Sequence, residues 1–257
     1  MSLVKQPLTR LEIVFETIDI PPPFSHRYSI AIRLETARPQ LDFEIAYSGR
    51  EHLSEEEILE EGFHIDDDFH WKGELPSVWK NAFLEELRRS KSLFDQPKQH
   101  AQQALSLSIA YQGGDVKEGL PNNQESWVYF SQEIIQAIYE VSEKERPLEI
   151  VYLEIGKQGK REIKIRPSFS YRKVQVNTYE QGQTSEKEHT WKVLKPLLST
   201  IYLPDYNAGL ALPQAPKKQG SYISPGDGLW YELGKAVVNP GEKRDVVGEM
   251  QQRIWDM

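Results

Sequence analysis

One segment of the chain concentrates imidazole and carboxylate side chains. His64, Asp66, Asp68 and His70 occupy alternate positions of the sequence His-Ile-Asp-Asp-Asp-Phe-His. Alternate side chains of an extended strand project from one face, so these four residues would share a face. Imidazole and carboxylate groups bind divalent metals such as zinc or manganese, and they also serve as general acids and bases. The segment therefore predicts a divalent-metal site at the centre of a hydrolase-like enzyme.

One strand cannot complete such a site, because neighbouring side chains on it point in parallel directions and do not converge. A histidine or carboxylate from elsewhere in the chain would have to join the four residues. The alternative interpretation is a solvated acidic loop whose aspartates cap the next element. The chain has 0 cysteines, which excludes disulfides and any thiolate-ligated metal.

A second cluster is basic. Lys160, Lys164 and Arg166 lie on one face of a predicted strand, and Phe169 and Tyr171 follow it. Cations and aromatic rings on a sheet surface bind single-stranded nucleic acid or another polyanion. The cluster predicts a non-enzymatic binding or assembly module, with a protein or a polyanion as its partner. The alternative is a sheet edge that charged side chains protect from aggregation.

The distribution of charge narrows the function classes. The net charge of −8 disfavours a general nucleic-acid coat protein. Acidic residues crowd the N-terminal half around Glu55–Glu57 and Asp66–Asp68, whereas the basic cluster lies in the C-terminal half. The two regions could meet within the molecule or across the interface of a homo-oligomer. No glycine-rich phosphate loop or nucleophile motif is present, so the sequence names no reaction.

The sequence also carries a prediction of cellular location. The first ten residues contain no apolar run of the kind found in signal peptides. No stretch of the chain is apolar over the length that a membrane span requires. We therefore expect a soluble cytoplasmic protein with no membrane partner.

Periodic patterns in the first half predict antiparallel strands and amphipathic helices. Residues 11–20, 28–34 and 41–47 alternate apolar and polar side chains or are rich in β-branched ones, which predicts a three-stranded meander. Ser54 and Glu57 form a capping box that opens a short acidic helix. Apolar residues at helical spacing predict longer helices over 75–89 and 125–142.

The second half of the chain continues the same pattern. Strands are expected over 105–111, 148–155, 160–166 and 172–179, and a helix over 188–202. Prolines and glycines punctuate 203–241, which predicts an irregular arm packed along the body. A short helix over 245–255 would end the arm.

These elements predict an α+β fold in which antiparallel meanders pack against amphipathic helices. The expected domains are 1–95, 104–203 and 204–257, with the Gln-rich residues 96–103 as a linker. A single domain is the alternative to this division.

Short sequence echoes raise the hypothesis of a duplicated β-β-β-α unit. Leu11–Phe15 resembles Leu148–Tyr152, and each begins a meander that leads to a Trp-Lys pair, at Trp79 and Trp191. A second echo relates Ala46-Tyr47 to Ala110-Tyr111. The alternative is one mixed sheet.

Overall fold

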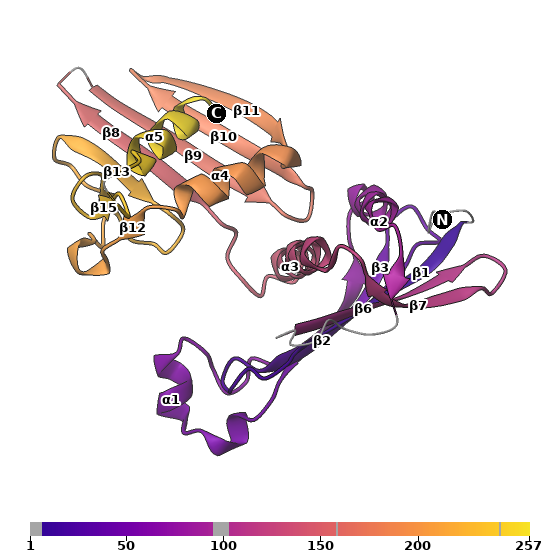
Figure 1. The fold of residues 1–257 in the computed structure, drawn as a ribbon. Coiled ribbons are helices and arrows are strands. Elements are labelled where there is room, and N and C mark those ends of the chain that lie inside the picture. The colour runs from indigo at the N-terminus through magenta and orange to yellow at the C-terminus, as the bar shows by residue number, and fades with distance from the viewer. Residues whose placement is uncertain (1–6, 95–102, 158, 242) are drawn as a thin grey trace. The chain divides into compact units, whose positions relative to one another are not determined.

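The computed structural model describes residues 7–94, 103–157, 159–241 and 243–257 (Figure 1). The chain divides into two compact units, Met1–Lys144 and Glu145–Met257, called here the N-terminal unit and the C-terminal unit. Each unit has an antiparallel sheet with helices, which confirms the predicted α+β class. Of the expected linker, residues 96–102 lie outside the described residues. The domain boundaries at 95, 104 and 203 stay predictions.

The sheet of the N-terminal unit contains seven strands in the order β4-β3-β2-β1-β6-β7-β5. Its strands are β1 (Leu8–Thr17), β2 (His26–Arg33), β3 (Gln40–Tyr47), β4 (Phe69–Glu74), β5 (Leu93–Phe94), β6 (Gln103–Tyr111) and β7 (Val116–Pro121). The predicted three-stranded meander is confirmed as β1–β2–β3. Its alternation has the expected cause, because Leu11, Ile13 and Phe15 are buried while the residues between them are not.

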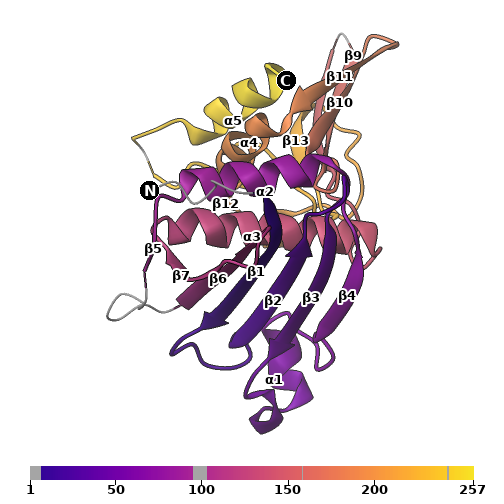
Figure 2. The ribbon, with the colours of Figure 1, turned by 90° about the vertical axis from the view of Figure 1, so that its right-hand side faces the viewer.

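Two helices cover the apolar face of this sheet, as Figure 2 shows. They are α2 (Val78–Arg89) and α3 (Gln124–Val141), whose buried stripes include Trp79, Phe83 and Trp127. The connection from β3 to β4 holds a 3-10 turn, Arg50–His52, and the short helix α1 (Glu55–Glu60) beyond the strand ends (Figure 2). The predicted capping box of Ser54 and Glu57 is present at the start of α1.

The sheet of the C-terminal unit contains six strands in the order β11-β10-β9-β8-β13-β14. Its strands are β8 (Ile150–Gly156), β9 (Gly159–Ser168), β10 (Lys173–Glu180), β11 (Gln183–Thr190), β13 (Gly220–Ser224) and β14 (Tyr231–Glu232). A separate pair is formed by β12 (Asp205–Tyr206) and β15 (Val237–Val238). Helices α4 (Leu194–Ile201) and α5 (Val246–Trp255) cover one face of the sheet (Figure 1).

Two expectations for the C-terminal unit differ from the structure. The helix expected from residue 188 begins at Leu194, after a 3-10 turn at Trp191–Val193, because β11 extends to Thr190. The irregular arm is not confirmed, since β13 of this region pairs with β8 inside the sheet. The terminal helix is present, and the side chain of Asp245 accepts a hydrogen bond from the N–H of Gly248 at its start.

The two units share one order of elements. Each has a four-stranded meander, then a helix, then further sheet strands and a last helix. The strand order β4-β3-β2-β1-β6-β7 corresponds to β11-β10-β9-β8-β13-β14, and the N-terminal sheet has the additional strand β5. The echo of Ala46-Tyr47 in Ala110-Tyr111 does not relate the units, because β3 and β6 belong to the same sheet. A shared order of elements does not establish common origin, so the duplication stays a prediction. None of the helices in the described ranges has both the length and the apolar character that a membrane crossing needs.

Candidate functional site

The predicted metal ligands do not share a face in the structure. Strand β4 begins only at Phe69, so His70 is extended while His64, Asp66 and Asp68 lie in the preceding loop. His70 Nε2 lies 2.8 Å from Asp42 Oδ1, on the neighbouring strand β3. Asp68 Oδ1 accepts a hydrogen bond of 2.8 Å from the N–H of Tyr47. The described ranges hold no group of three or more His, Cys, Asp or Glu side chains placed to bind a metal. The metal site stays a prediction without geometric support.

Arg50 organises the loop that carries these residues. Its Nη1 donates to the carbonyl oxygen of His64 at 2.7 Å and to Asp67 Oδ2 at 3.0 Å. Its Nε donates to the carbonyl oxygen of Pro23 at 3.1 Å. The guanidinium carbon lies 3.7 Å from the ring centroid of Tyr47, and the side chain is only 7% exposed. The hydrogen bonds of Arg50 therefore hold this acidic loop in place.

The predicted basic surface exists as a face of β9, but its cations are paired. Lys160, Lys164 and Arg166 lie on the face of the sheet opposite α4 and α5, and Glu162 lies among them. Glu162 accepts hydrogen bonds from Lys160 at 2.6 Å and is 3.2 Å from Lys164. Burial raises the pKa of the Glu162 carboxyl, but the hydrogen bonds from both lysines outweigh it and hold the pKa below its usual value. Arg166 Nε donates to Glu149 at 2.5 Å.

The two aromatic residues of the predicted surface are separated. Phe169 packs against the core with its ring centroid 5.0 Å from that of Trp191. Tyr171 is 61% exposed. Strand β9 lies between β8 and β10, so the alternative of a protected sheet edge does not apply to it. The edge strands of this sheet are β11 and β14. The polyanion surface stays a prediction, and neighbouring carboxylates neutralise its cations.

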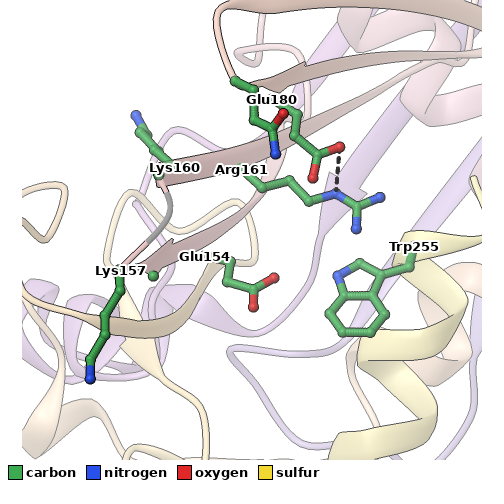
Figure 3. A pocket seen from close by; sticks show the side chains of 9 residues that line it. Glu154, Lys157, Lys160, Arg161, Glu180 and Trp255 are labelled. Atoms are coloured by element: carbon green, nitrogen blue, oxygen red, sulfur yellow. Dashed lines mark ion pairs between the residues drawn. The ribbon is translucent and has the colours of Figure 1, made fainter.

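A cleft of about 540 Å³ opens on the other face of the same sheet, the face that carries α4 and α5 (Figure 3). It lies at the end of the sheet where β8 turns into β9 and β10 turns into β11. Its floor is a row of three side chains, Glu154, Arg161 and Glu180, which stand directly opposite one another on adjacent strands. This row is called the charged row below. The lining residues are Glu154, Gly156, Lys157, Gly159, Lys160, Arg161, Glu180, Gln181 and Trp255.

The charged row lies where the apolar core ends. Tyr152 and Ile163 occupy the next position along β8 and β9 on the same face, and both are buried. Two steps further the chain reverses at Gly156 and Gly159, so the row has core on one side and solvent on the other. The β10–β11 turn is equally short. Its two residues, Gln181 and Gly182, have φ values of 52° and 81°, as a tight hairpin turn requires.

Arg161 lies in this cleft with few partners. Its Nε is 3.9 Å from Glu180 Oε2, beyond hydrogen-bonding distance, and this buried Nε has no hydrogen-bond acceptor among the residues that the structure describes. The guanidinium carbon lies 5.5 Å from the ring centroid of Trp255. The side chain as a whole is 29% exposed. Arg161 is thus partly desolvated, stacked on an aromatic ring and incompletely bonded.

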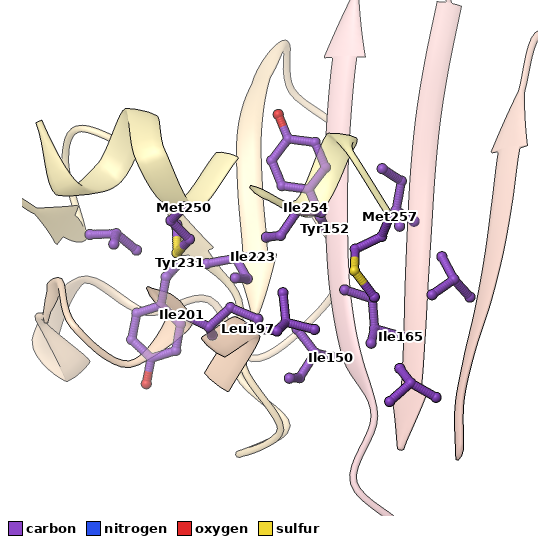
Figure 4. Close-up of a cluster of buried hydrophobic side chains, with 14 of the residues drawn as sticks. Ile150, Tyr152, Ile165, Leu197, Ile201, Ile223, Tyr231, Met250, Ile254 and Met257 are labelled. Atoms are coloured by element: carbon purple, nitrogen blue, oxygen red, sulfur yellow. The ribbon is translucent and has the colours of Figure 1, made fainter. Parts of the chain in front are cut away.

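Trp255 forms a fixed wall of the cleft because α5 is anchored in the core. Met250 and Ile254 of α5 pack with Leu197 and Ile201 of α4 beneath it (Figure 4). The Trp255 ring meets the buried ring of Tyr152 edge to face, with centroids 6.4 Å apart. Gln251 donates to the Tyr152 hydroxyl at 2.6 Å, and burial raises the pKa of that hydroxyl. Trp255 itself remains 36% exposed.

Comparison of the chain with protein-family models, with curated proteins and with solved structures returned no match. The candidate site therefore rests on its own geometry.

The sequence analysis did not predict the three residues of the charged row as site residues. A signal for them is present, because Arg161 falls in the same alternating phase as the buried Ile163 and Ile165. Glu180 likewise follows the phase of Val174 and Val176 on β10. Charged residues at core-phase positions near a strand end are the pattern that marks such a site.

Proposed function

We propose that the C-terminal unit is a binding module for a small ligand that carries an anionic group beside a flat apolar part. The observation that carries this proposal is Arg161, held over an exposed tryptophan ring with a buried Nε that lacks an acceptor. A buried donor without a partner costs about 1–3 kcal/mol. An anion placed in the cleft would supply acceptors to the guanidinium, and Arg is the side chain best suited to carboxylate or phosphate groups.

The shape of the cleft supports a small ligand. Its volume of about 540 Å³ falls within the range of small-molecule sites, roughly 300–1,000 Å³. The ring of Trp255 offers an apolar surface next to the guanidinium of Arg161, so one ligand could contact both. None of the described lining residues carries a hydroxyl or imidazole group, and the nucleophilic groups among them are the carboxylates of two glutamates and the amines of two lysines. We favour binding over catalysis because the feature that marks the cleft, Arg161 beside the ring of Trp255, is an arrangement that binds anions.

Nuclear magnetic resonance of the tryptophan indole groups tests the proposal. The chain has 6 tryptophans, and the Trp255 signal can be assigned with the variant Trp255→Phe. We expect 3-phenylpropanoate to shift the Trp255 signal saturably, with a dissociation constant of roughly 1 mM for so small a ligand.

Two variants complete the test. Arg161→Gln should abolish the shift, because it removes the cation that binds the carboxylate. The matched control is Lys164→Gln, a residue of the same strand that faces away from the cleft, and it should leave the shift unchanged. No saturable shift of Trp255 in the unaltered protein would refute the proposal, and so would an undiminished shift in Arg161→Gln.

A further inference from the structure

We infer that the ligand of this cleft is a zwitterion of the α-amino acid type, whose carboxylate binds Arg161 and whose ammonium group binds Glu154. The inference rests on the proposed function and adds the chemical class of the ligand. It starts from Glu154, which is paired in register with Arg161 on the adjacent strand.

No ion pair or hydrogen bond joins the side chains of Glu154 and Arg161, both of which are described residues. Directly opposite residues have Cβ atoms about 4.5–5.5 Å apart, so two side chains of this length could meet. Arg161 leans instead toward Glu180 and Trp255. Figure 3 shows the carboxylate of Glu154 on the other side of Arg161 from the carboxylate of Glu180. Within the described part of the chain, the carboxylate of Glu154 forms no ion pair and accepts no hydrogen bond.

The charged groups of the cleft indicate a ligand that carries both a positive and a negative group. Glu154 and Glu180 contribute two negative groups, and Arg161 contributes a positive one. Lys157 also lines the cleft, but its side chain points away from the charged row (Figure 3). Lys160 also lines the cleft, but its ammonium group is bound to Glu162 on the opposite face. A simple anion would meet repulsion from the carboxylates, and a simple cation would meet repulsion from Arg161. A zwitterion can place its negative group beside Arg161 and its positive group beside a carboxylate.

The proximity of Glu154 and Arg161 on adjacent strands favours a compact zwitterion. In an α-amino acid the ammonium and carboxylate groups are attached to one carbon atom, so they reach two neighbouring side chains at once. Glu154 and Arg161 are such neighbours. A flat or apolar side chain of the ligand would then lie against Trp255, which is 36% exposed beside them.

Three small probes with the same phenyl group separate the possibilities. L-Phenylalanine carries both charges, 3-phenylpropanoate only the negative one, and 2-phenylethylamine only the positive one. We expect L-phenylalanine to bind about tenfold more tightly than 3-phenylpropanoate, the effect of one charged hydrogen bond. The cationic probe should give no saturable shift of the Trp255 signal.

The variant Glu154→Gln assigns the ammonium group to its partner. It should bring the affinity for L-phenylalanine down to that for 3-phenylpropanoate and should not weaken the binding of 3-phenylpropanoate. The control Glu188→Gln removes the same charge from β11 on the opposite face, where Glu188 pairs with Lys173, and should change neither affinity. Hydrogen exchange of the β8 and β9 amides checks that each variant is folded.

The outcomes separate this inference from the proposed function. Binding of 3-phenylpropanoate as tight as that of L-phenylalanine, or an unchanged preference in Glu154→Gln, would overturn the zwitterion and leave the anion-binding module standing. A Trp255 signal that none of the probes shifts would overturn both. Tight binding of 2-phenylethylamine would also overturn both, because it would place a cation beside Arg161.

Discussion

The corresponding ends of the two sheets are built in opposite ways. Aligning Leu11–Phe15 with Leu148–Tyr152 puts Thr17, His26 and Tyr47 at the positions of the charged row. In the N-terminal unit this end is closed by the β3–β4 connection, residues 48–68, whose Arg50 stacks on Tyr47. In the C-terminal unit the matching β10–β11 connection is a tight turn, and the end is open.

The two arginines at these ends show what the difference means. Each has one buried nitrogen, Nη2 in Arg50 and Nε in Arg161, that finds no hydrogen-bond partner within the described ranges. Arg50 donates three hydrogen bonds through its other nitrogens, whereas Arg161 has only the 3.9 Å approach to Glu180. Contacts within the protein thus account for Arg50. They leave the Nε of Arg161 without an acceptor among the described residues, and this contrast is the physical reason for proposing a binding site in the C-terminal unit.

Replacement of Arg50 is expected to have the largest effect. Arg50→Met keeps the bulk of the side chain but leaves the carbonyl groups of Pro23 and His64 and the carboxylate of Asp67 without their donor. We expect the N-terminal unit to lose about 3 kcal/mol of stability, because the buried carbonyl of Pro23 and the part-buried carbonyl of His64 lose this donor, and Asp67 keeps only the N–H of His64 among the described donors. Hydrogen exchange of the β2 and β3 amides measures the loss, with the β8 and β9 amides as an internal control. A loss below about 1 kcal/mol would show that Arg50 does not close this end.

The corresponding replacement in the C-terminal unit, Arg161→Met, should increase stability instead of lowering it. Arg161→Met removes the buried Nε that lacks an acceptor and keeps an apolar side chain against Trp255. We expect a gain of about 1 kcal/mol in the stability of the C-terminal unit, as is common when a functional site is replaced by apolar packing. Exchange rates of the β8 and β9 amides provide the measurement. Destabilisation by this variant would mean that Arg161 is already satisfied and would remove the contrast between the two ends.

Much of the fold could be predicted from the sequence, and the reason is burial. Strands β1 to β3 each bury one face, so their alternation is visible in the residues, and the capping box of α1 is a local pattern that needs no tertiary information. Strand β11 could not be found in this way. Its sequence, QTSEKEHT, has no buried residue, so its pairing with β10 leaves no hydrophobic signal. The cleft depends on the register in which β8, β9 and β10 pair. That register could not be predicted from the local sequence pattern of any one strand.

The pKa values of buried tyrosines are raised by different causes in the two units. The difference predicts how the stability of the C-terminal unit depends on pH. Burial alone raises the pKa of Tyr28 in the N-terminal unit. In the C-terminal unit, a hydrogen bond donated to Asp227, together with burial, raises the pKa of Tyr231 to about 12. An unfolded tyrosine titrates near 10. The stabilisation from the protonated hydroxyl of Tyr231 is therefore complete below about pH 10 and lost as the pH rises toward 12.

Tyr231→Phe tests this difference. The variant lacks the titrating hydroxyl, so the C-terminal unit should lose less stability than the unaltered protein as the pH rises from 10 toward 12. Urea unfolding at a series of pH values, followed by tyrosinate absorbance, provides the measurement. Identical pH profiles for the two proteins would show that the bond to Asp227 does not control this titration.

The smallest expected effect concerns the outer face of β9, where Lys160, Lys164 and Arg166 predict polyanion binding. Glu162 and Glu149 form ion pairs with these cations. We therefore expect the protein to bind oligothymidylate very weakly at 0.15 M salt, about the physiological level. Changing all three cations to Ala should then alter the binding little. The double variant Glu149→Gln with Glu162→Gln should instead increase it, since both carboxylates are removed.

Fluorescence anisotropy of a labelled oligothymidylate measures these three proteins side by side. Tight binding by the unaltered protein that disappears in the triple Ala variant would support the polyanion surface and contradict the argument from pairing. The expected result would locate the difference within one strand. On β9, the outward cations are bound by carboxylates of the protein itself, whereas Arg161 on the inward face lacks a hydrogen-bond acceptor for its Nε. Incomplete pairing, more than the number of positive charges, would then distinguish the binding face from the other.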